Sequence, residues 1–231
     1  MGKAGHLSKP QAMVFDMDGT LFKTETLLLP AYYQVFDRLR EEGLYKGETP
    51  PEERILGSLG MLLEEIWKIV MPDEDLAVHR RADELLLEME LKGLKEENTE
   101  LYPQVAKTLH RLKERGVALF VASNGLEHYV KGIAEAHGIA SLLGGLYSAG
   151  EYQTRSKVDL LHLLMDRHHL DHVWMVGDRS SDVEAGKKNG QTAIGCNYAG
   201  FGNEDELKGA DAVITSFDQL LSLYDQAEAA E

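Results

Sequence analysis

Short apolar runs that stop abruptly at polar residues recur along this chain, and they constrain its fold more than any other feature. The clearest runs are 12–15, 117–122 and 173–176. Each is too short and too sharply ended to be a helix, so each predicts a buried strand. Weaker strand candidates are 145–148, 192–195 and 212–215.

Stretches with the length and patterning of helices separate these runs. They are residues 104–115, 127–137, 157–168 and 182–189. Strands that alternate with helices predict an α/β fold, with a doubly wound parallel sheet that helices cover on both faces. Polar residues follow three of the strands, at the carboxyl ends where sheets of this kind bind ligands.

Residues 24–97 interrupt this alternation. They contain no convincing strand, and their amphipathic stretches with helical spacing are 27–42, 51–56, 59–70 and 75–91. We therefore expect a helical subdomain inserted after the first strand. The predicted domain organisation is an α/β core formed by 11–23 and 98–225, with the helical insertion at 24–97.

The balance of charges argues against several classes of partner. The 231 residues include 24 Lys and Arg against 39 Asp and Glu, a formal net charge of −15. This charge disfavours binding to a nucleic-acid polymer or to anionic lipid. The chain has no run of roughly 18 apolar residues, which argues against a membrane span, and its first residues lack the apolar core of a signal peptide. A single cysteine, Cys196, allows no internal disulfide, so we expect a cytoplasmic protein.

The segment Asp16-Met17-Asp18-Gly19-Thr20 places two carboxylates directly after the first predicted strand. Residues two apart on a strand project to the same side, so both carboxyls can reach one site. Paired carboxylates can bind a divalent cation, divide the roles of nucleophile and acid or base, or do both. The alternative is a turn with two solvated aspartates, since Asp and Gly are common turn residues.

Three further segments carry polar residues at the start of a predicted helix. In the Ser-Asn-Gly segment at 123–125, a hydroxyl and backbone N–H groups can hold a phosphate oxygen, and the alternative is a helix cap alone. Lys157 opens the helix before the third strong strand, a position that by itself is typical of surface charge. After that strand, Asp178 and Asp182 lie four residues apart, which alone fits a helix cap with an acid in the first turn.

Taken in order, the Asp-x-Asp, Ser, Lys and Gly-Asp-x-x-x-Asp segments resemble the four motifs of the haloacid dehalogenase superfamily. The resemblance extends from Gln11 to about Leu223 and is to the phosphatase branch with a helical C1-type cap after the first strand. It implies a Rossmann-like core with 24–97 as the cap. The Lys157 segment and residues 176–202 are most similar to phosphoglycolate phosphatases and related 5'-nucleotidases.

The resemblance also implies a role for each motif residue. Asp16 would be the nucleophile that forms an aspartyl-phosphate. Asp18 would protonate the leaving oxygen and then activate the water that cleaves the acyl-phosphate. Ser123, Asn124 and Lys157 would bind the phosphoryl oxygens.

A Mg²⁺ ion is the cofactor that the resemblance implies. Asp178 would bind it together with the Asp16 carboxylate and the Asp18 backbone carbonyl. Asp182 would support the site, as a ligand through water or as a partner for Lys157. Electrostatics agrees with this assignment, because four acids around one point repel one another without a cation.

Arg54, Gly57 and Gly60 lie in the predicted cap and resemble the loop that contacts the substrate in relatives. This resemblance implies that they help to determine which leaving group is accepted. The alternative is a plain turn between two helices.

The predicted function is that of a magnesium-dependent phosphatase that hydrolyses a small phosphomonoester, phosphoglycolate-like or nucleotide-like, through an aspartyl-phosphate. The first alternative is a phosphosugar mutase similar to β-phosphoglucomutase, which would pass the phosphoryl group to a sugar. Gly177 before Asp178, in place of the Glu-Asp pair of the mutases, favours the phosphatase. The same motifs also leave open a pyrophosphatase and a non-catalytic binding protein with this fold.

Overall fold

Six short strands form one parallel sheet, in the order β3-β2-β1-β4-β5-β6. They are β1 (Ala12–Phe15), β2 (Ala118–Ser123), β3 (Gly145–Ser148), β4 (Val173–Gly177), β5 (Thr192–Cys196) and β6 (Ala212–Ile214). Every residue of the central strand β1 is buried, as expected for a strand covered on both faces. The chain builds one half of the sheet outward from β1 and then the other half outward from β4. The crevice at the carboxyl ends of β1 and β4 is therefore the expected ligand site.

The computed structural model describes residues 7–59, 61, 63–96, 99–200 and 205–228. In this part of the chain, no helix is both long and apolar enough to cross a membrane.

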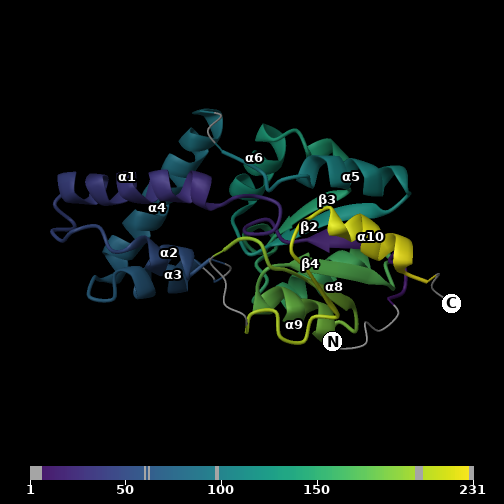
Figure 1. Cartoon of the computed structure of the whole chain (residues 1–231). Coiled ribbons are helices and arrows are strands. Elements are labelled where there is room, and N and C mark those ends of the chain that lie inside the picture. Colours follow the sequence, from purple (N-terminus) through teal and green to yellow (C-terminus); the bar gives the residue numbers. More distant parts are fainter. Residues whose placement is uncertain (1–6, 60, 62, 97–98, 201–204, 229–231) are drawn as a thin grey trace.

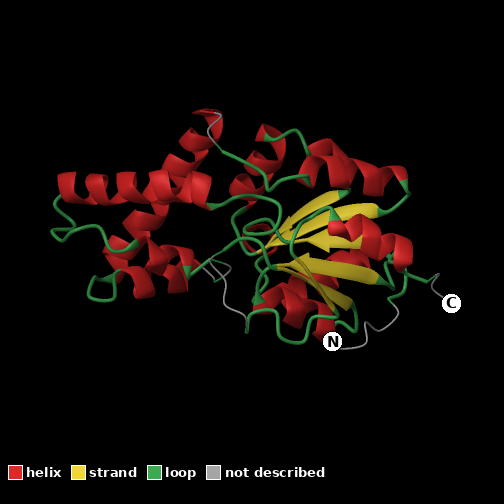
Figure 2. Ribbon diagram, viewed as in Figure 1, coloured by secondary structure: helices red, strands yellow, loops and turns green. Residues whose placement is uncertain are grey.

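Helices cover both faces of the sheet (Figure 2). They are α5 (Val105–Glu114), α6 (Glu127–Ala136), α7 (Ala149–Tyr152), α8 (Lys157–His168), α9 (Ser180–Lys188) and α10 (Gln219–Gln226), with η2 (Ala140–Leu142) before β3. Met13 and Phe15 lie in a core with residues of α5, α6 and α10. Ala12 and Val14 lie in a second core with residues of α8 and α9. The alternation follows from the two-residue period of side chains along a strand.

A layer of helices with its own apolar core lies beyond one end of the sheet, on the left in Figure 1. This helical layer comprises α1 (Glu25–Glu41), α2 (Glu52–Leu56), α3 (Leu63–Val70) and α4 (Leu76–Gly93), followed by η1 (Leu94–Glu96). Tyr32, Phe36, Trp67 and Leu85 pack together in its core and are at most 1 % exposed. The helical layer therefore has a hydrophobic core that is separate from the two cores of the sheet.

The structure confirms the predicted doubly wound parallel sheet, and each expected strand ends within one residue of its predicted bounds. The largest difference concerns 59–70, which the pattern predicts as one helix. The helix is described from Leu63, and residues 57–59 form a turn that begins at Gly57, since glycine weakens a helix. Residues 60 and 62 lie outside the described residues. The sequence pattern makes no prediction for α7 or α10, whose 4 and 8 residues are too short for a clear period.

Candidate active site

The turn after β1 brings the first carboxylate to the edge of the sheet. The Met17 carbonyl accepts the backbone N–H groups of Leu21 and Phe22, both at 3.0 Å, which closes the turn. Gly19 has a φ of +73°, a conformation that glycine adopts without a steric cost. A Cβ at this position would lie 2.3 Å from Asp178 Oδ2. The turn can therefore approach the loop after β4 this closely only because residue 19 is glycine.

Lys157 lies between two of the predicted site carboxylates. Its ammonium is 2.8 Å from Asp16 Oδ1 and 2.6 Å from Asp182 Oδ1, and all three side chains are at most 3 % exposed. Ser156 caps α8 and makes Lys157 its first residue, which directs the lysine to this edge of the sheet. Burial alone would lower the pKa of Lys157, but the two carboxylates raise it, so the ammonium stays charged.

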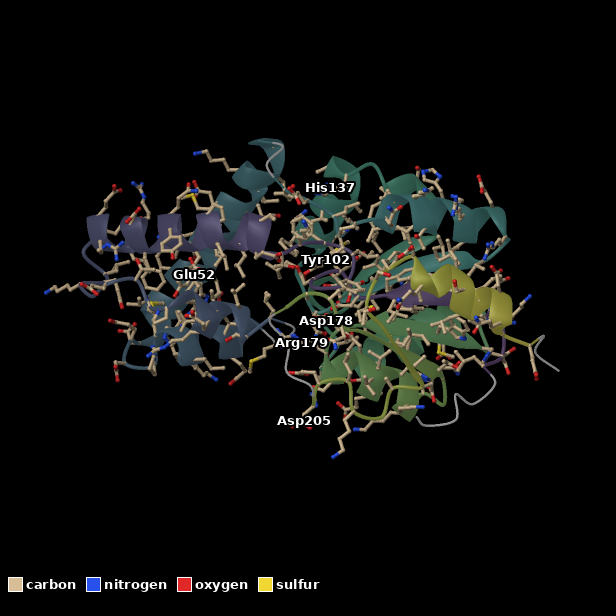
Figure 3. The ribbon with its side chains drawn as sticks, in the orientation of Figure 1. Glu52, Tyr102, His137, Asp178, Arg179 and Asp205 are labelled. Atoms are coloured by element: carbon tan, nitrogen blue, oxygen red, sulfur yellow. The ribbon has the colours of Figure 1, made fainter. Side chains whose placement is uncertain are left out.

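The loop after β4 supplies two more carboxylates, Asp178 and Asp182, and Figure 3 shows Asp178 at the end of the sheet that faces the helical layer. Oxygens of Asp16, Asp178 and Asp182, the carboxylate cluster, all lie within 4.8 Å of one another. Burial, and then the charges of the other two carboxylates, raises the pKa of Asp178 well above its usual value. Burial also raises the pKa of Asp182 to about 6. The three carboxylates therefore repel one another, and a bound cation would reduce this repulsion.

The carboxylate cluster fits a divalent cation, because carboxylate oxygens are the ligands that hard cations such as Mg²⁺ prefer. Asp182 accepts Lys157 through Oδ1 at 2.6 Å and the Arg179 backbone N–H through Oδ2 at 3.0 Å. Both of its oxygens are thus occupied by hydrogen bonds. Asp16 pairs with Lys157 through Oδ1, and Asp178 accepts a longer hydrogen bond, 3.3 Å, from Thr20 Oγ1, so these two side chains are better placed to hold a metal ion.

Asp18 has partners that differ from those of the carboxylate cluster. Thr24 Oγ1 donates a 2.8 Å hydrogen bond to Asp18 Oδ1, and the Tyr129 hydroxyl donates one of 2.6 Å to the same oxygen. Burial raises the pKa of Asp18, and the two hydrogen bonds partly oppose this rise. Because both bonds end on Oδ1, Oδ2 is the oxygen on which the carboxyl can carry a proton.

Ser123 and Asn124 line the same cavity as the predicted catalytic carboxylates and Lys157. Ser123 ends β2 and is 1 % exposed, and its Oγ accepts the N–H of Gly125 at 3.1 Å. The next helix, α6, begins at Glu127. The structure therefore brings the predicted phosphate-binding segment, Asp16, Asp18 and Lys157 to one cavity at the carboxyl edge of the sheet.

This cavity has a volume of about 400 Å³ and extends into the helical layer. The side chains that the layer contributes are mostly apolar. They include Leu28, Ile55, Leu59, Ile66, Leu86 and Leu87, which we call the apolar wall. The carboxyls of Asp83 and Glu90 border the same part of the cavity. Residues of the sheet edge and of the helical layer thus line one cavity.

The predicted substrate loop lines this cavity, but with residues other than those that the resemblance implies. Among the described residues, neither Arg54 nor Gly57 lines the cavity. Arg54 Nη1 instead donates to the Val70 carbonyl at 3.3 Å. Consecutive side chains of a helix point about 100° apart. Because Ile55 lies in the apolar wall, the side chain of Arg54 points away from the cavity. Gly60 lies outside the described residues.

Arg179 connects the loop after β4 to the helical layer, and Figure 3 places it between the two. It is 7 % exposed, and its Nη2 donates to the Leu56 carbonyl at 3.1 Å. Its Nη1 lies 3.4 Å from Glu206 Oε1. These contacts hold α2, which carries Ile55 of the apolar wall, against the end of the sheet.

Sequence patterns do not point to three of the residues at this site, namely Thr24, Tyr129 and Glu90. Thr24 and Tyr129 contact Asp18, and Glu90 borders the cavity. Tyr129 is 111 positions from Asp18 in the sequence. Its place in the first turn of the helix after the phosphate-binding segment is the one sequence signal that could have singled it out.

Comparisons with known proteins identify the family of this chain. The model of the haloacid dehalogenase-like hydrolase family matches residues 10–190. The phosphoglycolate phosphatase of Escherichia coli K12 is 26 % identical over 239 residues, with 91 % of each chain covered. That of Aquifex aeolicus is 29 % identical over 188 residues, which cover 80 % of this chain and 84 % of the relative.

Solved structures share the fold over nearly the whole chain. CbbY from Rhodobacter sphaeroides in complex with phosphate has a TM-score of 0.78 and 22 % identity, with 94 % of this chain and 99 % of that one covered. A predicted phosphoglycolate phosphatase from Haemophilus somnus has a TM-score of 0.77 and 20 % identity, with 92 % and 97 % covered. With the family match over residues 10–190, these findings show that the chain belongs to the haloacid dehalogenase-like hydrolase family.

Proposed function

We propose that this chain is a magnesium-dependent phosphatase that hydrolyses a small phosphomonoester through an aspartyl-phosphate on Asp16. The observation that carries the proposal is the buried contact of Lys157 with Asp16 and Asp182, beside Asp178 and at the end of a cavity. Phosphoryl transfer needs a nucleophile, fixed positive charge and room for the leaving group. The family, and the similarity to phosphoglycolate phosphatases, support the same reaction.

In the first step, an Asp16 carboxylate oxygen forms a bond to phosphorus while the bond from phosphorus to the alcohol oxygen breaks. Asp18 Oδ2 delivers its proton to the leaving oxygen, a role that the raised pKa of this carboxyl supports. The Lys157 ammonium and the Ser123 hydroxyl bind the phosphoryl oxygens, whose negative charge they offset.

In the second step, water hydrolyses the aspartyl-phosphate. Asp18, now without its proton, removes a proton from the water that attacks phosphorus, and the bond between phosphorus and Asp16 breaks. Thr24 and Tyr129 keep Oδ1 of Asp18 in place, so Oδ2 has the same orientation in both steps. The acid of the first step is thereby regenerated for the next turnover.

Mg²⁺ is the ion that we propose for the carboxylate cluster, with the Asp16 and Asp178 carboxylates and the Asp18 backbone carbonyl as ligands. When bound, it supplies positive charge next to the phosphoryl group. Asp182 accepts Lys157 and the Arg179 N–H and so positions the lysine. Residues 24–97 act as a cap over the core formed by 11–23 and 98–225.

Hydrolysis of para-nitrophenyl phosphate tests this proposal. The protein should release phosphate with Mg²⁺ and lose this activity when EDTA removes the metal. Mass spectrometry of acid-quenched Asp18→Asn, in which the second step is slowed, should find a phosphoryl group on the peptide that contains Asp16. If neither para-nitrophenyl phosphate nor phosphoglycolate yields phosphate in the presence of divalent metal, the proposal is wrong.

A further inference from the structure

We infer that the preferred substrate is the phosphate monoester of an apolar alcohol that carries no second anionic group. The inference rests on the proposed phosphatase function and concerns the part of the cavity that receives the leaving group. Side chains of the helical layer carry it, and none of them takes part in the two chemical steps.

The apolar wall favours a leaving group with an extended hydrocarbon part. Leu28 of α1, Ile55 of α2 and Leu86 of α4 line the cavity and are at most 5 % exposed. An alkyl or aryl group that replaces water against these side chains gains about 0.8 kcal/mol for each buried methylene. A carboxylate or phosphate in the same place would lose its hydration without a polar partner.

The helical layer supplies no positive charge to this part of the cavity. Residues 24–37, 55–66 and 82–91, the segments that form its wall, contain no Lys, Arg or His. Of the described residues that line the cavity, Lys157 alone is a cation, and Asp16 and Asp182 already pair with it. A second anionic group on the leaving group would therefore have no cation to bind.

Carboxyls at the border of the apolar wall strengthen this preference. Glu90 is 8 % exposed and lines the cavity, and no other side chain of the described residues forms a hydrogen bond or ion pair with it. Asp83, which accepts a hydrogen bond from the Trp67 indole N–H, lines the same region. An anionic tail would oppose the ionisation of these carboxyls, whereas a hydroxyl could form a hydrogen bond with Glu90 in either protonation state.

The size of the cavity points the same way. A volume of about 400 Å³ lies in the range, roughly 300–1,000 Å³, in which proteins bind drug-sized molecules. Phosphoglycolate, the compound that gives the relatives their name, has a two-carbon leaving group that ends in a carboxylate. It would leave the apolar wall in contact with water and would place its charge near Glu90.

A series of n-alkyl phosphates tests the contribution of the apolar wall. With Mg²⁺ present, kcat/KM should rise from ethyl to butyl to hexyl phosphate. The expected increase is up to about fourfold for each methylene, which is the fold-change that corresponds to about 0.8 kcal/mol. A kcat/KM that does not change with chain length would contradict the inference.

A matched pair of substrates tests the exclusion of charge. A butyl phosphate whose far end carries a carboxylate should have a kcat/KM at least about tenfold below that of butyl phosphate. At a pH high enough to ionise Glu90, Glu90→Gln should narrow this difference in kcat/KM. Leu87→Arg, which adds a cation to the apolar wall, should narrow it further. Glu88→Gln makes the same substitution at an exposed position of the same helix, and the difference in kcat/KM between the two substrates should stay as in the wild type.

The outcomes separate the inference from the function on which it rests. A higher kcat/KM for phosphoglycolate or for the carboxylate-ended chain than for butyl phosphate overturns the inference and leaves the phosphatase function in place. If the protein hydrolyses none of these phosphomonoesters, including para-nitrophenyl phosphate, both the inference and the phosphatase function are wrong.

Discussion

The Tyr129 hydroxyl donates a 2.6 Å hydrogen bond to Oδ1 of Asp18, and Thr24 donates to the same oxygen at 2.8 Å. Tyr129 belongs to α6, one of the helices that cover the sheet, and Thr24 directly precedes α1 of the helical layer. One oxygen of Asp18 is therefore held from both parts of the molecule. In the proposed mechanism, these hydrogen bonds to Oδ1 orient the side chain of Asp18, and Oδ2 transfers the proton.

Replacement of Tyr129 by Phe tests whether its hydrogen bond to Oδ1 affects proton transfer by Asp18. The hydrogen bond from Tyr129 lowers the pKa of Asp18, so its loss should raise that pKa further above its usual value. The step that needs deprotonated Asp18 should then require a higher pH, and kcat should fall by about tenfold or more near neutral pH. The pH profile of kcat measures the shift, which a purely structural role would not produce.

The control for this variant is Tyr45→Phe. The Tyr45 hydroxyl donates to the Glu48 carbonyl at 3.0 Å, within the helical layer. Tyr45→Phe should therefore leave the pH profile of kcat unchanged. If Tyr129→Phe and Tyr45→Phe have the same profile, Tyr129 does not position Asp18.

Replacement of Asp16 by Asn keeps the shape of the side chain and removes the attacking carboxylate. We expect kcat for para-nitrophenyl phosphate to fall by at least about 1,000-fold, while circular dichroism and thermal unfolding still show a folded protein. Asp37→Asn, which removes an exposed carboxylate that pairs with Arg40, is the matched control and should retain activity. A folded Asp16→Asn with a tenth of wild-type turnover would rule out a covalent mechanism at this residue.

Replacement of Lys157 by Met should strongly destabilise the metal-free protein. The substitution leaves Asp16 and Asp182 buried without their cation, and loss of one partner from a buried ion pair costs about 3–5 kcal/mol. Chemical denaturation measures the loss in the free energy of unfolding. Mg²⁺ should restore part of it, because the ion supplies positive charge to the same carboxylates.

Lys187→Met provides the comparison for this loss of stability. Lys187 pairs with Asp211 on the surface, with both side chains partly exposed, and such pairs contribute about 0–1 kcal/mol. An equal loss of stability in the two lysine variants would show that Lys157 does not offset buried negative charge.

The sequence was sufficient to predict that certain residues of the candidate site lie close together, namely those whose positions follow from local structure. Asp16 and Asp18 come directly after a strand whose four residues are all buried. Lys157 is the first residue of a helix that Ser156 caps. Because parallel strands end at one edge of the sheet, short-range patterns were enough to bring these residues together.

Residues that depend on how helices pack could not be predicted in this way. Tyr129 reaches Asp18 only because α6 lies next to the turn after β1. The rotation of α2 determines that Ile55, and not the adjacent Arg54, lines the cavity. Such rotations depend on side chains from distant segments, and resemblance to a cap loop cannot supply them.

Glu90 should make the stability of the metal-free protein depend on pH. Burial, and then the charge of Asp18, raises the pKa of Glu90 well above its ordinary value of 4.5 in the folded state. Folding therefore disfavours the charged form, at about 1.4 kcal/mol for each unit between the folded and unfolded pKa values. The contribution of Glu90 to the free energy of unfolding should fall as pH rises above 4.5 and become constant above the folded pKa.

Glu90→Gln removes this contribution, since glutamine does not ionise. We expect the variant to unfold at a higher denaturant concentration than the wild type near pH 8. The difference should shrink as pH falls towards about 4, where Glu90 is largely protonated in the folded and the unfolded protein alike. Glu88→Gln, exposed on the same helix, should give no such pH-dependent difference. If Glu90→Gln differs from the wild type by a constant amount across this range, Glu90 is not the group whose burial opposes ionisation.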